Sequence, residues 1–233
     1  MKPNESEIQS ILQQISDVLL INGGLLTNPG LYNGDMGLVL FFAHYVRYTH
    51  IDLYSDYCYD LINKLQSKIN WETPLNYETG LSGIGSAIEY LIQKGFFETN
   101  SDEILEDFDT RIFFTINSPY LQISEVIDIG HYTMWRLSGN SSKKDMIRQN
   151  IIPLIEKILR EQSDIKLNHP FGRRKTPHYL VEKTSDHCLD QIAKNCFWNQ
   201  ELGLQNGLAG WGLSLLTELD GNDSWISLLH EKN

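Results

Sequence analysis

Polar side chains stand inside three short glycine-rich turns, and these are the positions at which the chain could bind or transform a ligand. The turns span residues 30–37, 80–85 and 203–210. None of them contains a cysteine or a histidine. Their amides, hydroxyls and single carboxylate suit hydrogen bonding, and the carboxylate also suits proton transfer. The candidate binding residues are Tyr32, Asn33, Asp35, Ser82, Gln205 and Asn206.

Paired carboxylates are a second candidate chemistry, because hydrolysis of a glycosidic bond needs two acids that face each other across a cleft. Asp35 and Glu78 stand beside glycine turns, and Glu89 lies in a segment expected to form a buried helix. Acids near a helix start also serve as caps, so both interpretations stay open. His44 and His131 each lie in a buried-helix pattern, where a histidine is commonly a hydrogen-bonded core residue.

A third possibility is a metal site at His187, Cys188 and Cys196, which lie close together in one expected helix. A closed zinc site needs four ligands and a turn between ligand pairs, and neither feature is visible here. We therefore expect Cys196 to be a core residue and His187 a surface residue. The sequence predicts neither a bound metal nor another cofactor.

The elements that carry these residues have helical periodicity throughout, and no convincing run of strands is found. Amphipathic segments with one apolar stripe alternate with shorter segments that are apolar on all sides and should be buried. Asn22-Gly23-Gly24 is expected to end the first helix through a left-handed glycine, and Ser101 is expected to cap a later one. The amphipathic segments are 8–19, 52–69, 102–116, 145–161 and 180–197, and the buried ones are 38–47, 83–94, 125–137 and 207–219.

A glycine turn precedes each buried helix, which indicates a repeat. The first two turns begin at Gly30 and Gly80, and a degenerate copy follows at 128–137. A fixed period of this length is typical of arrays in which each unit buries its face on its neighbours. We expect an all-α fold made of about four helical hairpins, forming one domain over residues 1–233. Residues 163–178, with two prolines and a basic run, should form a loop.

Three stretches resemble the lanthionine synthetase C-like family. They are Gly30-Leu-Tyr-Asn-Gly-Asp-Met-Gly37 with the apolar helix that follows it, Gly80-Leu-Ser-Gly-Ile-Gly85, and Leu204-Gln-Asn-Gly-Leu-Ala-Gly-Trp-Gly-Leu213. The resemblance runs in register over nearly the whole chain. It implies an α/α toroid, in which outer helices ring inner ones and the glycine turns face a central cavity. With about four hairpins, this chain resembles a short or partial toroid.

The zinc ligands of that family's cyclases are a Cys-His pair directly before a turn glycine and a Cys in an earlier turn. In this sequence Gln205 and Asn206 precede Gly207, Tyr32 and Asn33 precede Gly34, and Leu81 and Ser82 precede Gly83. Amide and hydroxyl side chains are poor zinc ligands. The resemblance therefore implies a non-zinc accessory or binding protein in the maturation of a ribosomally made peptide. The alternatives are a carbohydrate-active enzyme or unconventional cyclase on the same fold, and a purely structural interaction module.

We expect the candidate binding residues to gather around one central cavity. Converging helix N-termini would direct free N–H groups into it, which would favour a carboxylate or a peptide C-terminus. The expected partners are a peptide or another maturation protein, and an incomplete ring could also pair with a second copy.

Charge and composition limit the remaining possibilities. Residues 1–140 carry 7 basic and 18 acidic side chains, a net charge of -11 that disfavours nucleic acid and suits a cationic peptide. The N-terminus lacks the pattern of a signal peptide, and no apolar run is long enough for a membrane span. The three cysteines form no disulfide framework, so we expect a reduced, cytoplasmic protein.

Overall fold

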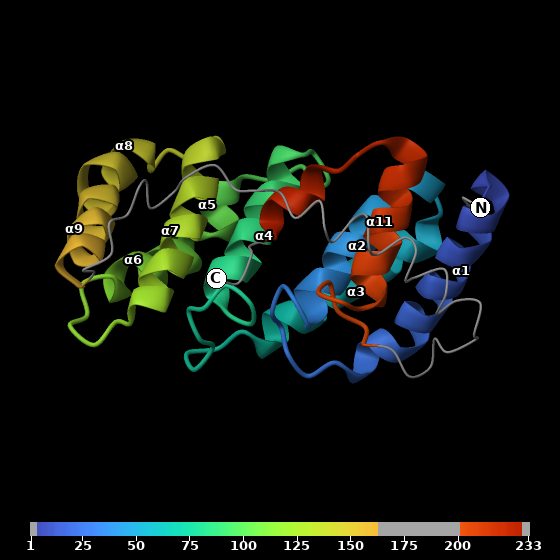
Figure 1. Cartoon of the computed structure of the whole chain (residues 1–233), viewed down its shortest axis with the longest axis horizontal. Coiled ribbons are helices and arrows are strands. Elements are labelled where there is room, and N and C mark those ends of the chain that lie inside the picture. Colours follow the sequence, from blue (N-terminus) through green and yellow to red (C-terminus); the bar gives the residue numbers. More distant parts are fainter. Residues whose placement is uncertain (1–3, 163–200, 230–233) are drawn as a thin grey trace. The chain divides into compact units, whose positions relative to one another are not determined.

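The computed structural model describes residues 4–162 and 201–229, and every described element is helical (Figure 1). The expected loop at 163–178, the expected helix at 180–197 and the candidate metal residues His187, Cys188 and Cys196 lie outside the described residues. The chain divides into two compact units, one formed by residues 1–71 with 175–233 and one by residues 72–174. The single-domain expectation stays a prediction, and the units are described separately.

The described part of unit 1 contains four long helices from the two ends of the chain. Helix α2 packs against both α3 and α11, and α11 also packs against α1 (Figure 1). Helix α2 is buried on nearly every side, since its residues 35–45 are all inaccessible to solvent. The elements are α1 (Glu5–Asn22), η1 (Gly23–Leu25), α2 (Asp35–Thr49), α3 (Asp52–Lys68), α11 (Leu208–Asp220) and η4 (Ser224–Leu228).

Unit 2 is arranged around α7, which packs against α4 and α9, while α6 packs against α4. A π-helical turn, η2, joins α8 to α9 and adds an extra residue to the helical turn there. The elements are α4 (Leu81–Gln93), α5 (Ser101–Ile104), α6 (Glu106–Thr115), α7 (Ile123–Ser138), α8 (Lys144–Met146), η2 (Ile147–Ile151) and α9 (Ile152–Gln162).

The helical expectation is confirmed for every described segment, because apolar residues at helical spacing need a core to cover them. Three local predictions from the sequence are wrong. Gly23 is not left-handed but has a φ of -59° and begins a 3₁₀ turn. The N-cap near Ser101 is Asn100, whose side chain accepts from the N–H of Asp102. Gly130, the centre of the degenerate glycine turn, lies inside α7, which a Gln122–Glu125 capping box begins instead.

Candidate functional site

Three helices begin with the same backbone arrangement. In each, an N-cap glycine in extended conformation follows a loop that folds back under the helix, and the N–H of the first helical residue donates to the carbonyl seven positions earlier. The helices are α2, α4 and α11. The bonds are Asp35 N to Asn28 O at 2.9 Å, Leu81 N to Pro74 O at 2.8 Å and Leu208 N to Glu201 O at 2.8 Å.

The second N–H of each helix also donates seven positions back along the chain. The expectation that these helix starts point free N–H groups at an anion is therefore wrong for their first two positions. The loop beneath each helix supplies the carbonyl partners that a bound anion would otherwise replace. These second bonds are Met36 N to Pro29 O, Ser82 N to Leu75 O and Ala209 N to Leu202 O.

The N-cap positions are glycine because a side chain would collide with the folded-back loop. A Cβ at Gly34 would stand 2.6 Å from Gly30 O, and one at Gly207 would stand 2.5 Å from Gly203 O. At Gly80 the equivalent neighbour is Asn76 O, 2.8 Å away. These distances are shorter than any ordinary carbon–oxygen contact, so the loop could keep its path only by shifting its backbone.

This equivalence corrects the register of the second turn. Gly80, and not Gly83, corresponds to Gly34 and Gly207. The two residues before it are Glu78 and Thr79, which take the place previously given to Leu81 and Ser82. Ser82 is instead the second residue of α4, fully buried in unit 2, and its Oγ has no hydrogen-bond partner among the described residues.

The first and third turns are joined directly within unit 1. The carbonyl oxygen of Tyr32 accepts from Leu204 N at 2.6 Å and from Gln205 N at 3.1 Å. Gly203 lies so close that a Cβ there would be 2.5 Å from Tyr32 O and 2.7 Å from the Cα of Asn33. These contacts bring Tyr32, Asn33, Gln205 and Asn206 to one place, although about 170 residues separate the two turns in sequence.

The joined turns present amide side chains to solvent. Asn33 and Asn206 are exposed and Gln205 is half-buried, whereas Tyr32 is buried beneath them. Asn206 has a φ of 59°, a left-handed conformation that asparagine tolerates better than most residues. Among residues 4–162 and 201–229, nothing hydrogen-bonds to the side-chain amides of these three residues. We call Asn33, Gln205 and Asn206 the amide tip.

Asp35 does not belong to the amide tip. Its side chain is fully buried, and its two oxygens accept from Lys64 Nζ at 2.9 Å and from Lys68 Nζ at 2.5 Å. Both lysines also donate to backbone carbonyls, those of Gly23 and Leu26 respectively. Burial lowers the pKa of Lys68, against the opposing effect of Asp35. The two ion pairs of Asp35 therefore connect the start of α2 to the end of α3. Both carboxylate oxygens are already paired with lysines.

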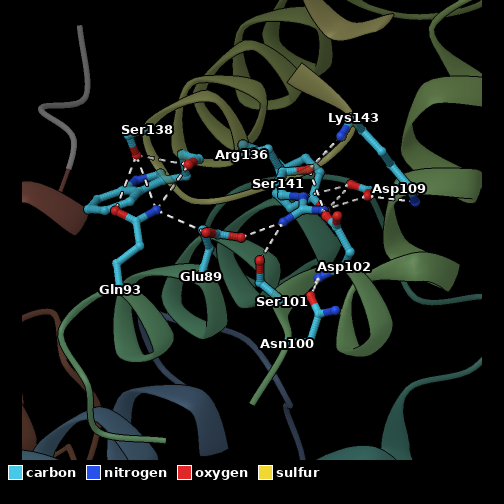
Figure 2. A network of polar contacts seen from close by, with 12 residues as sticks. Glu89, Gln93, Asn100, Ser101, Asp102, Asp109, Arg136, Ser138, Ser141 and Lys143 are labelled. Carbon is cyan, nitrogen blue, oxygen red and sulfur yellow. Dashed lines mark hydrogen bonds and ion pairs between the residues drawn. The ribbon is translucent and has the colours of Figure 1, made fainter. Parts of the chain in front are cut away.

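A buried ionic network in unit 2 was not predicted from the sequence (Figure 2). The guanidinium of Arg136 is fully buried, with Glu89 on one side and Asp102 and Asp109 on the other. The N···O distances are 2.5 Å to Glu89, 2.5 Å to Asp102 and 2.9 Å to Asp109. Lys143 adds a second cation, 3.0 Å from Asp109. The network connects α4, α5, α6 and α7 through charge-assisted bonds.

Hydrogen bonds lower the pKa of one carboxyl of this network. Burial pushes the pKa of Asp102 upward, but bonds from Ser141, Ser142 and Arg136 outweigh it and hold that pKa well below its usual range. The hydroxyl of Tyr132 donates to Asp109 at 2.6 Å, and burial beside that carboxylate raises the pKa of Tyr132 well above its ordinary value. The sequence signal for this network is Arg136 itself, which stands on the buried stripe of α7.

Two further titratable groups have shifted pKa values. Burial, with Arg47 nearby, lowers the pKa of His44 to about 4, so His44 is a neutral core residue at physiological pH. Burial raises the pKa of Asp128 to about 6; a hydrogen bond from the backbone of Tyr77 opposes the shift, and the charges of Glu78 and Glu125 add to it.

Across the described ranges no three His, Cys, Asp or Glu side chains gather in a form that could hold a metal ion. No described helix is long and apolar enough to cross a bilayer.

The chain was also compared with known proteins. No protein-family description, curated protein or solved structure matches it. The fold and the site therefore rest on this chain's own residues and on the geometry of its three glycine turns.

Proposed function

We propose that this chain is a lanthionine synthetase C-like helical repeat, built on an α/α toroid, that binds a peptide and does not run zinc-dependent cyclisation. The observation that carries the proposal is the amide tip. Two glycine turns from opposite ends of the chain are joined by backbone hydrogen bonds, and the polar groups that they present are Asn33, Gln205 and Asn206.

Amide side chains suit an extended peptide. Each carboxamide offers two N–H donors and a carbonyl acceptor, which matches the alternating N–H and C=O groups of a peptide backbone. The same groups are poor zinc ligands, and in the corrected register the residues before the three turn glycines contain no cysteine or histidine. The side chains at these turns are therefore suited to hydrogen-bonding a peptide, and they lack the zinc ligands that zinc-activated thiol addition needs.

The carbohydrate-active alternative is weaker, because two of its candidate acids are engaged elsewhere. A general acid or nucleophile must present an oxygen to substrate. Both oxygens of Asp35 are held by lysines, and Glu89 is buried against Arg136. Glu78 is half-buried, and the two acids predicted beside it are thus held by cations.

The test is a binding titration of fluorescent, end-capped, unstructured peptides that contain Cys, Ser and Thr, followed by anisotropy. We expect the wild-type protein to bind a subset of the peptides. The Asn33→Asp/Asn206→Asp double variant should bind them about tenfold more weakly, since two neutral hydrogen bonds contribute on the order of 1 kcal/mol each. Aspartate is similar in size and also tolerates the left-handed conformation at position 206, so the turns should stay folded.

The matched control is Asn63→Asp, an exposed asparagine on α3, which should leave the affinity unchanged. Equal affinities of the wild-type protein and the double variant would contradict the proposal. Failure of every peptide to bind would also contradict it and would favour a purely structural module.

A further inference from the structure

The segment from α5 to the turn after α6 exposes carboxylates near its start and aromatic rings near its end. Exposed positions 103, 106–107, 110, 114 and 117 recur at intervals of three or four, as expected for one side of a helix, although Leu105 interrupts the two helices and Tyr120 lies in the turn that follows α6. We call this surface the acidic–aromatic stripe, and it consists of Glu103, Glu106, Asp107, Phe114 and Tyr120.

The two aromatic side chains of the stripe are almost entirely in solvent. Phe114 is 82% exposed and Tyr120 is 90% exposed, while the adjacent Phe113 is in the core. The connection that carries them is ordered by hydrogen bonds, from Asn117 N to Phe114 O at 3.3 Å and from Tyr120 N to Ser118 Oγ at 3.3 Å. Large aromatic rings held outward in this way are typical anchors of protein interfaces.

The carboxylates of the stripe lie in an acidic part of the chain. Residues 72–140 contain 11 acidic and 3 basic side chains, a net charge of -8. Of the three basic residues, Arg136 is buried in its own network and Arg111 donates to the carbonyl of Thr73. Within the described part of the chain, no cation forms an ion pair with Glu103, Glu106 or Asp107.

We propose that the acidic–aromatic stripe is a docking surface for a basic, amphipathic segment of a partner protein, rich in lysine or arginine and carrying apolar anchors. The carboxylates attract and pair the cationic side chains, and Phe114 and Tyr120 take up the apolar anchors and stack with cations. A second copy of this chain is a poor occupant, because its own net charge of -11 would bring like charges together. The stripe consists of residues of unit 2 and the amide tip of residues of unit 1, so this proposal does not depend on the proposed function.

The experiment uses the full chain and a labelled helical peptide built of repeated Leu-Lys-Lys-Leu units, with binding followed by anisotropy over a range of salt concentrations. We expect binding that weakens as salt rises, because exposed charges are screened. Phe114→Ala/Tyr120→Ala should weaken binding about tenfold, as the loss of central aromatic anchors does. Glu106→Gln/Asp107→Asn should weaken binding about threefold and reduce its salt dependence.

Two controls separate this surface from the general acidity of the chain. Asp56→Asn/Asp60→Asn removes two exposed carboxylates of α3 and should leave binding unchanged, and so should Leu53→Ala, which removes a 60% exposed apolar side chain. A Leu-Glu-Glu-Leu peptide should not bind. The proposal is overturned if the basic peptide does not bind, or if the α3 variants weaken binding as much as the stripe variants. It is also overturned if light scattering shows that the wild-type protein is a dimer and that the Phe114→Ala/Tyr120→Ala variant is a monomer.

Discussion

Arg136 shows how a single charged residue can organise a helical core. Its guanidinium has lost all contact with water, and three carboxylates from three other helices replace that water. A buried charge of this kind stabilises the fold only while its partners are complete, because removing one leaves the others uncompensated in a medium of low dielectric constant.

Replacement of Arg136 by methionine should therefore destabilise the protein strongly. Arg136→Met leaves Glu89 as a buried acid without its cation and leaves Asp109 with Lys143 alone, and we expect a loss of about 3–5 kcal/mol in the free energy of unfolding by urea. The control is Arg148→Met, since the side chain of Arg148 is 59% exposed and, within the described residues, forms an ion pair only with Asp145. The control should change stability by less than about 0.5 kcal/mol. Equal, small effects of both variants would contradict this description of the network.

Asp128 makes the stability of the protein depend on pH. Burial raises its pKa to about 6, so the folded state binds a proton more tightly than the unfolded state does. The contribution of Asp128 to the free energy of unfolding should consequently fall as pH rises from about 4 to 6, whereas that of His44, whose pKa is lowered to about 4, should rise over a similar range. Asp128→Asn should remove the contribution of Asp128 from the wild-type profile and raise stability at pH 7 by on the order of 1 kcal/mol, a figure reduced for solvent screening because the carboxyl is only partly buried.

Urea unfolding at several pH values measures this effect. Asp60→Asn, an exposed acid on α3, serves as the control and should keep the pH profile of the wild-type protein. If Asp128→Asn also left the profile unchanged, the carboxyl of Asp128 would titrate at its ordinary pKa in the folded protein.

At the scale of an element, the glycine turn is the unit that recurs. Its N-cap glycine makes room for the loop, and the loop's carbonyls satisfy the first two N–H groups of the helix. An ordinary N-cap uses a side-chain oxygen for that purpose, as Asn4 does in α1. In the three glycine turns, backbone carbonyls of the loop take the place of the side-chain oxygen of an ordinary N-cap. This arrangement requires glycine at the N-cap, because a Cβ there would collide with the loop.

Alanine at these N-caps should be costly. We expect Gly80→Ala and Gly207→Ala each to lose about 1–3 kcal/mol of stability, because the loop backbone must move away from the new Cβ. Gly24→Ala is the matched control, since nothing lies within 4 Å of a Cβ at Gly24, and it should be neutral or slightly stabilising. Thermal unfolding of the three variants provides the measurement, and equal melting temperatures would contradict the backbone-capping role.

Much of this element-level structure can be predicted from sequence, because helical periodicity and glycine position are local signals. The stripe of α1 and the all-round apolarity of α2 predicted both helices correctly. The second turn was misread because Gly80-Leu-Ser-Gly83 offers two glycines, and only the bonds to Pro74 and Leu75 reveal which one is the N-cap.

The candidate site was harder to predict, because its contacts join residues far apart in the chain. Asn33, Gln205 and Asn206 were predicted as binding residues from the turn motif, but nothing local reveals that Tyr32 accepts from Leu204 and Gln205. Asp35 was counted with them because it follows the first turn. Its burial depends on ion pairs with Lys64 and Lys68, whose long side chains extend from α3 to the start of α2.

At the scale of the whole molecule, the acidic charge and the repeated turns are the features on which the two binding proposals depend. Unit 1 is assembled from residues near both ends of the sequence, so the first and third turns can meet only when those ends fold together. The amide tip forms only in that folded state, so a peptide bound there, as we propose, would stabilise unit 1 by linkage.

The most direct test of the central claim is a nuclear magnetic resonance titration that follows side-chain amide signals while a binding peptide is added. The N–H₂ groups of Asn33, Gln205 and Asn206 should shift together with one saturation curve, because they face the same ligand. Those of Asn63 and Asn140, exposed residues elsewhere on the chain, should remain in place. Saturation without movement of the three amide-tip signals, or with movement only at Asn63 and Asn140, would contradict peptide binding at the joined glycine turns.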